Sequence, residues 1–174
     1  MKKKITLIVL AVVILFLAAA GLWYTRPMTL EQLCPGIELS ECVQLRVYFF
    51  QSAEDRPASS GSDELTLTTE DPEFSALLGQ FQGRTFRRSL LGLLPQGTRT
   101  HATSAGDFKW EVIFRFEQIS LPDGSTVSGD MLQLSNFFGT LDISFDGETW
   151  RATTGGKNQW LADVMAVINA AQAD

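Results

Sequence analysis

The two cysteines, Cys34 and Cys42, are the first residues whose spacing suggests chemistry. They are separated by Pro-Gly-Ile-Glu-Leu-Ser-Glu, and Pro35 with Gly36 predicts a chain reversal that brings the thiols together. Thiol redox enzymes usually place their cysteines two residues apart, and a structural zinc site needs four ligands. In an oxidising compartment the pair therefore predicts a structural disulfide, with free thiols as the alternative. No metal or cofactor site is predicted.

Three arginines in the segment Gly-Arg-Thr-Phe-Arg-Arg, residues 83–88, are the best candidates for recognition of a ligand. A guanidinium group offers paired donors to a carboxylate or a phosphate and can stack on aromatic rings. Arg84, Arg87 and Arg88 are therefore the predicted contacts for an anionic ligand or an acidic partner. If this segment is a strand, Arg87 and Arg88 point to opposite faces, so only one of them belongs to a single site. The alternative is a set of solvated side chains.

Hydrolytic chemistry has few candidate residues in this chain. His101 is the only histidine, and Asp142 with Asp146 is an example of a carboxylate pair of the kind that glycosidases use. No Gly-x-Ser-x-Gly element accompanies the histidine. A solvated loop histidine and the polar side of an amphipathic strand are the simpler interpretations. We predict no catalytic residue, and an envelope hydrolase using carboxylates or His101 remains the alternative function.

The amino-terminal segment determines where this chemistry takes place. Residues 5–24 are uncharged and mostly aliphatic, follow three lysines and precede Arg26. About twenty such residues cross a bilayer as a helix. The excess of positive charge on the amino side predicts a single-pass anchor, residues 1–26, with a cytoplasmic amino terminus and an extracellular domain. Trp23 and Tyr24 suit the membrane interface, whereas Ala18 to Ala20 offer a signal-peptide cleavage pattern, so cleavage near Ala20 and secretion is the alternative.

The remaining residues, 27–174, are predicted to form one extracytoplasmic domain. All twenty acidic residues follow Arg26, while three of the fourteen basic residues precede it, so the part from Arg26 onward carries a formal charge of −9. This charge argues against nucleic acid as a partner. The possible partners are the membrane, through residues 5–24, and an envelope protein or a cell-wall ligand.

Strand and helix patterns predict an α+β domain. A capping-box pattern at Thr29 and Gln32 predicts a short helix, Asp71 and Pro72 begin a second helix that Gly83 ends, and an apolar stripe predicts a third over residues 157–171. Alternating or β-branched runs predict strands at residues 43–51, 65–69, 84–91, 108–117, 131–138, 141–145 and 150–154. Hairpin turns such as Asp146-Gly147 favour an antiparallel sheet of about six or seven strands with helices on one face.

Three stretches carry a family resemblance. They are Leu-Thr-Leu-Thr-Thr-Glu-Asp-Pro-Glu-Phe-Ser-Ala-Leu-Leu at 65–78, Phe-Arg-Arg at 86–88 and Phe-Asp-Gly-Glu-Thr-Trp-Arg-Ala at 145–152. In this order the chain resembles small membrane-anchored or secreted extracytoplasmic proteins of Gram-positive anaerobic bacteria. The resemblance implies a fold and supplies no site residues. Together with the anchor, it leads to the expectation of a non-enzymatic binding or interaction domain of the cell envelope; a secreted structural protein is a further alternative.

Overall fold

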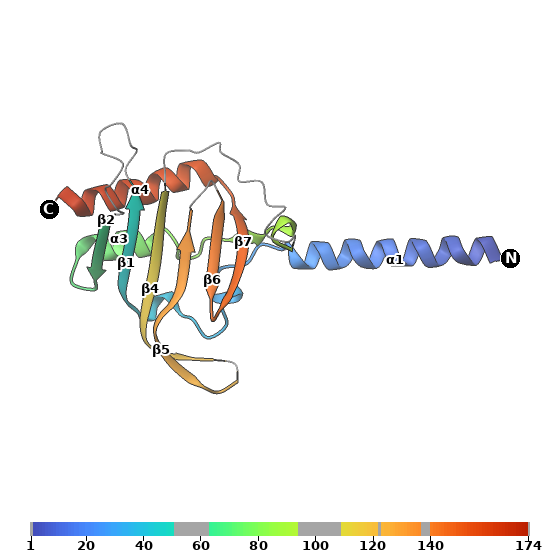
Figure 1. Ribbon diagram of the computed structural model, residues 1–174, viewed down its shortest axis with the longest axis horizontal. Helices are drawn as coiled ribbons and strands as arrows, with labels where there is room; N and C mark the ends of the chain where they lie inside the picture. The colour runs from blue at the N-terminus through green and yellow to red at the C-terminus, as the bar shows by residue number, and fades with distance from the viewer. Residues whose placement is uncertain (1, 51–62, 94–108, 122, 137–139, 174) are drawn as a thin grey trace.

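The protein is an α+β domain with an apolar helix at its amino terminus, as predicted. The computed structural model describes residues 2–50, 63–93, 109–121, 123–136 and 140–173. Seven strands form one antiparallel sheet in the order β2-β1-β4-β5-β6-β7-β3 (Figure 1). The strands are β1 (Cys42–Phe50), β2 (Asp63–Thr68), β3 (Phe86–Arg88), β4 (Lys109–Ser120), β5 (Thr126–Ser135), β6 (Leu141–Phe145) and β7 (Glu148–Thr154).

Four α-helices and two 3-10 helices complete the described part of the chain. They are α1 (Lys2–Tyr24), α2 (Leu30–Leu33), η1 (Leu39–Glu41), α3 (Pro72–Gly79), η2 (Leu90–Leu93) and α4 (Lys157–Ala173). Helices α3 and α4 lie behind the sheet in Figure 1, and none of the described helices lies on the face toward the viewer. Strand residues therefore alternate between a face buried under helices and an open face, as in β6, where Leu141, Ile143 and Phe145 are buried.

Helix α1 extends away from the domain (Figure 1). Its segment Lys4–Tyr24 has a mean hydropathy of 3.0, and none of its most apolar stretch is buried within the structure. By length and composition this helix can cross a membrane, which is consistent with either a signal anchor or a signal peptide. An exposed apolar helix of this length needs an apolar environment that the domain itself does not provide.

Aromatic side chains connect the sheet to the helices. Trp110 of β4 and Trp160 of α4 are buried with ring centroids 5.7 Å apart, and Phe81, which follows α3, lies 5.7 Å from Trp160 and 5.1 Å from Phe114. These edge-to-face pairs each contribute about 0.5–1.5 kcal/mol beyond the burial of their area. The Trp160 indole N–H also donates to the Gln80 carbonyl at 3.0 Å, so α4 is fixed against the end of α3.

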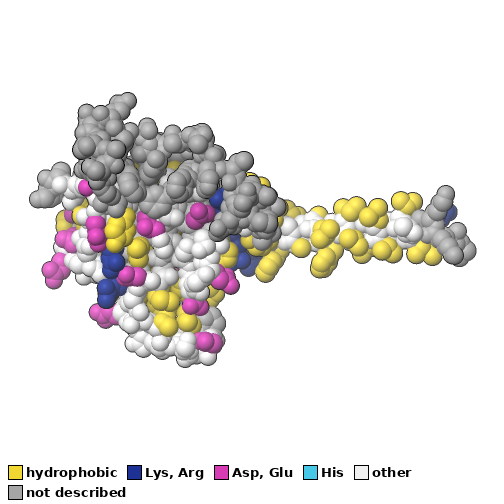
Figure 2. Space-filling view, in the orientation of Figure 1, with side chains coloured by type: hydrophobic (Ala, Val, Ile, Leu, Met, Phe, Trp, Pro, Cys, Tyr) yellow, Lys and Arg dark blue, Asp and Glu magenta, His cyan; other side chains and the backbone are white. Residues whose placement is uncertain are grey.

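The open face of the sheet carries polar side chains that pair with one another. Arg46 of β1 lies 3.0 Å from Asp130 of β5, and the Tyr48 hydroxyl donates to Glu64 of β2 at 3.3 Å. Figure 2 shows acidic and basic side chains interspersed over the face toward the viewer. These pairs neutralise part of the acidic charge on this face and tie β1 to β2 and β5.

Several boundaries differ from those predicted. Helix α3 ends at Gly79 because Gln80 and Phe81 form tight turns onto Leu77 and Leu78. The predicted strand 84–91 is shorter, since η2 begins at Leu90. Strand β5 begins at Thr126, five residues before the predicted start, and the predicted ends at residues 51, 108 and 138 lie outside the described residues.

Candidate functional site

A cleft forms where α1 meets the domain, and we call it the junction cleft. It has a volume of about 400 Å³. Its walls come from the end of α1, the following segment through Pro35, strand β3, the end of β4 and the β6–β7 hairpin. The lining side chains that matter below are Trp23, Tyr24, Arg26, Arg88, Asp146, Glu148 and Trp150. Aromatic walls with a few charged groups are typical of a site that binds a small ligand.

The segment after α1 attaches to the edge of the sheet and so positions the end of the helix. Met28 forms an isolated antiparallel bridge with Phe86 of β3, with N–O distances of 2.9 and 2.8 Å. The Thr29 N–H donates to the Gln32 side chain at 3.1 Å, which is the amino-terminal capping contact predicted for α2. Because β3 is the edge strand, its neighbours in space are residues 24–28 on one side and β7 on the other.

Two turns, at Gly36 and at Asp146-Gly147, position the cleft walls that do not come from α1 or β3. Gly36 has φ +96, and a Cβ added there would lie 2.2 Å from the Ser120 carbonyl oxygen, so this position requires glycine and lets the chain pass closely over the end of β4. Asp146 and Gly147 have φ of 47 and 76, as the predicted two-residue hairpin requires, and this turn presents Asp146 and Glu148 at the cleft.

Arg88 lies between two aromatic rings in the junction cleft. Its guanidinium carbon is 4.7 Å from the centroid of Trp150 and 5.7 Å from that of Tyr24. Its Nε atom is buried and has no hydrogen-bond partner. Within the described residues the side chain of Arg88 forms no hydrogen bond or ion pair. The cation–π contacts hold the plane of the guanidinium and leave its N–H donors free for an acceptor.

Three further charged groups line the same cleft. Arg26 stacks at 5.0 Å over Trp23, and its Nε donates to the Met28 sulfur at 3.4 Å. Asp146 and Glu148 are exposed on the hairpin. Among the residues that the structure describes, no ion pair joins these carboxylates to Arg26 or Arg88. The cleft therefore holds two cations and two anions that do not neutralise one another by direct contact.

The other two predicted arginines lie elsewhere. Arg84 donates to the Thr154 hydroxyl at 3.1 Å and to the Gly155 carbonyl at 3.0 Å, and it stacks at 4.8 Å over Trp160. Burial lowers the pKa of the Arg84 guanidinium, although a nearby acid, Asp163, acts in the opposite direction. Arginine remains charged at neutral pH despite such a shift. Arg84 thus joins the chain before β3 to the turn before α4.

Arg87 is exposed on the opposite face of β3 from Arg88. This arrangement confirms the expectation that consecutive strand residues separate the two guanidinium groups. The structure therefore brings only Arg88 of the three predicted arginines to the junction cleft.

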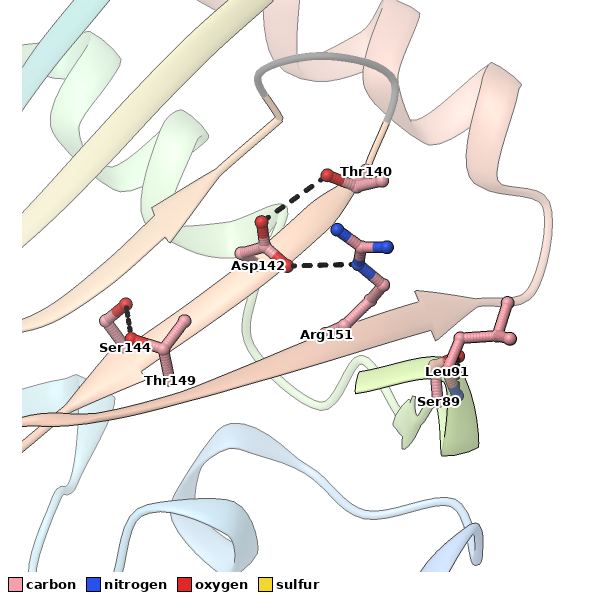
Figure 3. A network of polar contacts seen from close by, with 7 residues as sticks. All are labelled: Ser89, Leu91, Thr140, Asp142, Ser144, Thr149 and Arg151. Carbon is pink, nitrogen blue, oxygen red and sulfur yellow. Dashed lines mark hydrogen bonds and ion pairs between the residues drawn. The ribbon is translucent and has the colours of Figure 1, made fainter. Parts of the chain in front are cut away.

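The carboxylates considered for hydrolysis do not form a pair of free acids. Asp142 of β6 lies on the open face, where its Oδ1 is 3.6 Å from Arg151 Nε and its Oδ2 accepts from the Thr140 hydroxyl at 3.4 Å (Figure 3). Asp146 lies in the turn at the junction cleft. Neutralisation by Arg151 favours a structural role for Asp142. His101 lies outside the described residues, and the hydrolase alternative stays a prediction.

The structure contains both cysteines as free, buried thiols rather than the expected disulfide. Cys34 ends α2, whereas Cys42 begins β1 and its thiol donates to the Gln44 carbonyl at 3.4 Å. The turn at Gly36 and helix η1 occupy the intervening residues, so each thiol is directed into the core. Burial raises the pKa of Cys34 to about 12 and that of Cys42 to about 11. The disulfide itself stays a prediction.

Sequence reasoning missed most of this site. Tyr24 and Trp23 carried a signal as interfacial aromatic residues, and Arg88 was a candidate, but nothing local connected them to Trp150 or Glu148. These three segments are brought together by the antiparallel pairing of β3 with β7 and by the bridge between Met28 and Phe86. Periodicity within one segment gives no information on such long-range contacts.

The donor atoms of the described residues do not suggest a metal centre. No group of three or more His, Cys, Asp or Glu side chains lies close enough together in the described ranges to hold a metal ion. Comparisons with protein-family models, with curated proteins and with solved structures found no match, so the function must be argued from the geometry of the junction cleft.

Proposed function

We propose that this protein is a membrane-anchored extracytoplasmic binding domain that receives its ligand in the junction cleft. In this proposal α1 is retained in the bilayer, the three lysines remain on the cytoplasmic side and the sheet domain lies outside the membrane. The excess of positive charge before the uncharged residues 5–24 of α1 supports this orientation. The length and hydropathy of the helix support the membrane location.

The single observation that carries the binding role is the state of Arg88. A guanidinium with a buried Nε that no hydrogen bond satisfies is costly unless an acceptor arrives. Here the side chain is held in place by Tyr24 and Trp150, so it is already oriented before a ligand binds. Such preorganisation favours a binding function over a purely structural one.

The proposed site adjoins the anchor helix. Trp23 and Tyr24 line the junction cleft, so the anchor is part of the cleft. Cleavage near Ala20 would free the domain from the membrane while leaving these two residues on the mature chain. Because the proposal places these two residues at the membrane surface, its test uses the intact chain in a membrane.

Site-specific photo-crosslinking tests the proposed function. The full chain in native membranes carries p-benzoylphenylalanine in place of Glu148, which lines the cleft, or in place of Glu70, which is exposed beyond β2 at the opposite edge of the sheet. We expect discrete adducts from position 148 and none from position 70, detected by mass spectrometry. Equal labelling at both positions, or none at either, would contradict a binding role for the cleft.

A further inference from the structure

The charges around the junction cleft indicate what kind of ligand it accepts. Its lining contains two cationic side chains, Arg26 and Arg88, and two anionic side chains, Asp146 and Glu148. A purely anionic ligand would gain from the arginines and be opposed by the carboxylates. A zwitterion with a phosphate and an ammonium group can use both, because guanidinium pairs with phosphate oxygens while a carboxylate accepts from an ammonium group.

The aromatic residues support the same ligand chemistry. The face of a tryptophan or tyrosine ring attracts a guanidinium group, and the rings of Trp150 and Tyr24 hold Arg88 in this way at 4.7 and 5.7 Å. Glu148 precedes Trp150 by two residues along β7 and lines the cleft with it. The stacked guanidinium can therefore face the anionic group of a ligand, while the carboxylates of the same hairpin accept from its ammonium group.

The position of the cleft indicates where such a ligand comes from. Trp23 and Tyr24 are the last residues of the apolar helix, at the depth where lipid headgroups lie if α1 spans the bilayer. Helix η2 begins two residues after Arg88, which stacks on Tyr24 of α1, and its Leu90 and Leu91 are 52% and 61% exposed. Exposed leucines next to a membrane helix fit contact with a lipid surface better than contact with water.

We propose that the junction cleft binds the headgroup of a zwitterionic phospholipid, with the phosphate at Arg88 and Arg26 and the ammonium group at Asp146 and Glu148. This inference rests on the proposed binding function and names its ligand class. The acyl chains would remain in the bilayer beside α1, with Leu90 and Leu91 contacting the same leaflet. The domain would thus be held close to the membrane surface by a second contact besides its anchor.

Native mass spectrometry of the full chain in mild detergent tests this assignment. The probe is an equimolar mixture of phosphatidylethanolamine, which is zwitterionic, and phosphatidylglycerol, which is anionic. We expect one retained phosphatidylethanolamine, and a loss of about tenfold or more in retention for Arg88→Gln. Arg87→Gln is the matched control, since it removes the same charge from the neighbouring residue on the opposite face of β3, and it should retain the lipid fully.

A second pair of variants separates the two halves of the headgroup. Glu148→Gln should keep lipid binding but reduce the preference for phosphatidylethanolamine over phosphatidylglycerol several-fold. Glu70→Gln, at an exposed position outside the cleft, should leave the preference unchanged. Circular dichroism of each variant establishes that it is folded, and Arg88→Lys, which keeps the charge but loses the planar donor pair, should give intermediate retention.

Other outcomes overturn the proposal in distinguishable ways. Equal retention by Arg88→Gln and Arg87→Gln, or no preference between the lipids in the wild type, would reject the headgroup assignment. Soluble phosphoethanolamine that bound in an Arg88-dependent manner without lipid retention would reject the bilayer as its source. A protein or glycan adduct from position 148 would reject the lipid but leave the proposed binding function standing, and no adduct would reject both.

Discussion

Arg84 and Arg88 each lie over a tryptophan ring, but only Arg84 has its polar groups satisfied by the protein. Arg84 stacks on Trp160 and donates to Thr154 and Gly155. Arg88 stacks on Trp150 and Tyr24 and has a buried Nε with no partner. Since the residue type and the stacking are the same, the difference lies in the surrounding acceptors. One arginine stabilises the fold, and the other remains available for a ligand.

The same contrast extends to the two tryptophans. Trp160 is 1% exposed and contacts Phe81, Phe86 and Trp110 in the core. Trp150 is only partly buried and forms a wall of the junction cleft. A group at the centre of the packing contributes to the free energy of unfolding, whereas a group at the wall of a cleft contributes mainly to what the cleft can hold.

The largest effect should come from Trp160→Ala. Removing this ring leaves a cavity among three aromatic neighbours and an unpaired Gln80 carbonyl, so we expect a loss of about 3–5 kcal/mol in the free energy of unfolding. Guanidinium-induced unfolding of the full chain in mild detergent, followed by near-ultraviolet circular dichroism, measures it. Trp150→Ala should cost less than half as much. Equal losses would show that the two tryptophans are packed alike and would remove the contrast.

Arg84→Gln should have the next largest effect on stability. The variant loses the stacking on Trp160 and the hydrogen bonds to Thr154 and Gly155, which together predict a loss of about 1–3 kcal/mol. Arg87→Gln, at an exposed position, should change the same free energy by less than about 0.5 kcal/mol. If both substitutions had the same small effect, Arg84 would not be a structural residue.

The pH dependence of stability tests whether the two thiols are buried, including Cys34, whose neighbours Leu33 and Pro35 line the cleft. Their folded pKa values, about 12 for Cys34 and about 11 for Cys42, are above that of a thiol in an unfolded chain, about 8.5. Below that pH both states are protonated and the stabilisation is fully present. Above it the unfolded chain releases protons that the folded chain retains, so the stability of the reduced protein should fall by about 1–2 kcal/mol between pH 8 and 9.

The double variant Cys34→Ala/Cys42→Ala is the control for this pH dependence and should show a flatter profile. Intact-mass measurement after alkylation without reductant distinguishes the redox states. Free thiols should be labelled only after unfolding, because both are buried. An unfolded chain that took up no label would instead contain the disulfide that the sequence predicts.

The fold could be predicted because its signals are local. Alternation in residues 109–117 gave β4, the Asp146-Gly147 pair gave the β6–β7 hairpin, and the apolar stripe gave α4. The early start of β5 could not be predicted, since residues 126–130 are exposed or half-buried and carry no apolar alternation. Their strand conformation comes from pairing with Arg115 to Ser120 of β4.

The junction cleft could be predicted only in part. Arg88 was identified from its type and neighbours, and Tyr24 from its place at the end of an apolar run. Their contact with Trp150 depends on the edge position of β3, which follows from the strand order of the whole sheet. Arg84 was predicted to lie in a strand over residues 84–91, but it lies in the segment before β3. Its backbone N–H donates to the Phe81 carbonyl there, and its side chain stacks on Trp160.

Apart from the control Arg87→Gln, the smallest expected change in stability is that of Arg88→Gln, and it is the most informative for the comparison. Arg88→Gln removes two cation–π contacts, each contributing about 0.5–1 kcal/mol at a partly exposed site. It also removes a buried Nε that has no hydrogen-bond partner, which offsets this loss. We therefore expect the free energy of unfolding to change by less than about 1 kcal/mol in the absence of ligand, measured as for Arg84→Gln. A loss as large as that of Arg84→Gln would mean that Arg88 supports the fold, and the difference between the two arginines would then be one of degree.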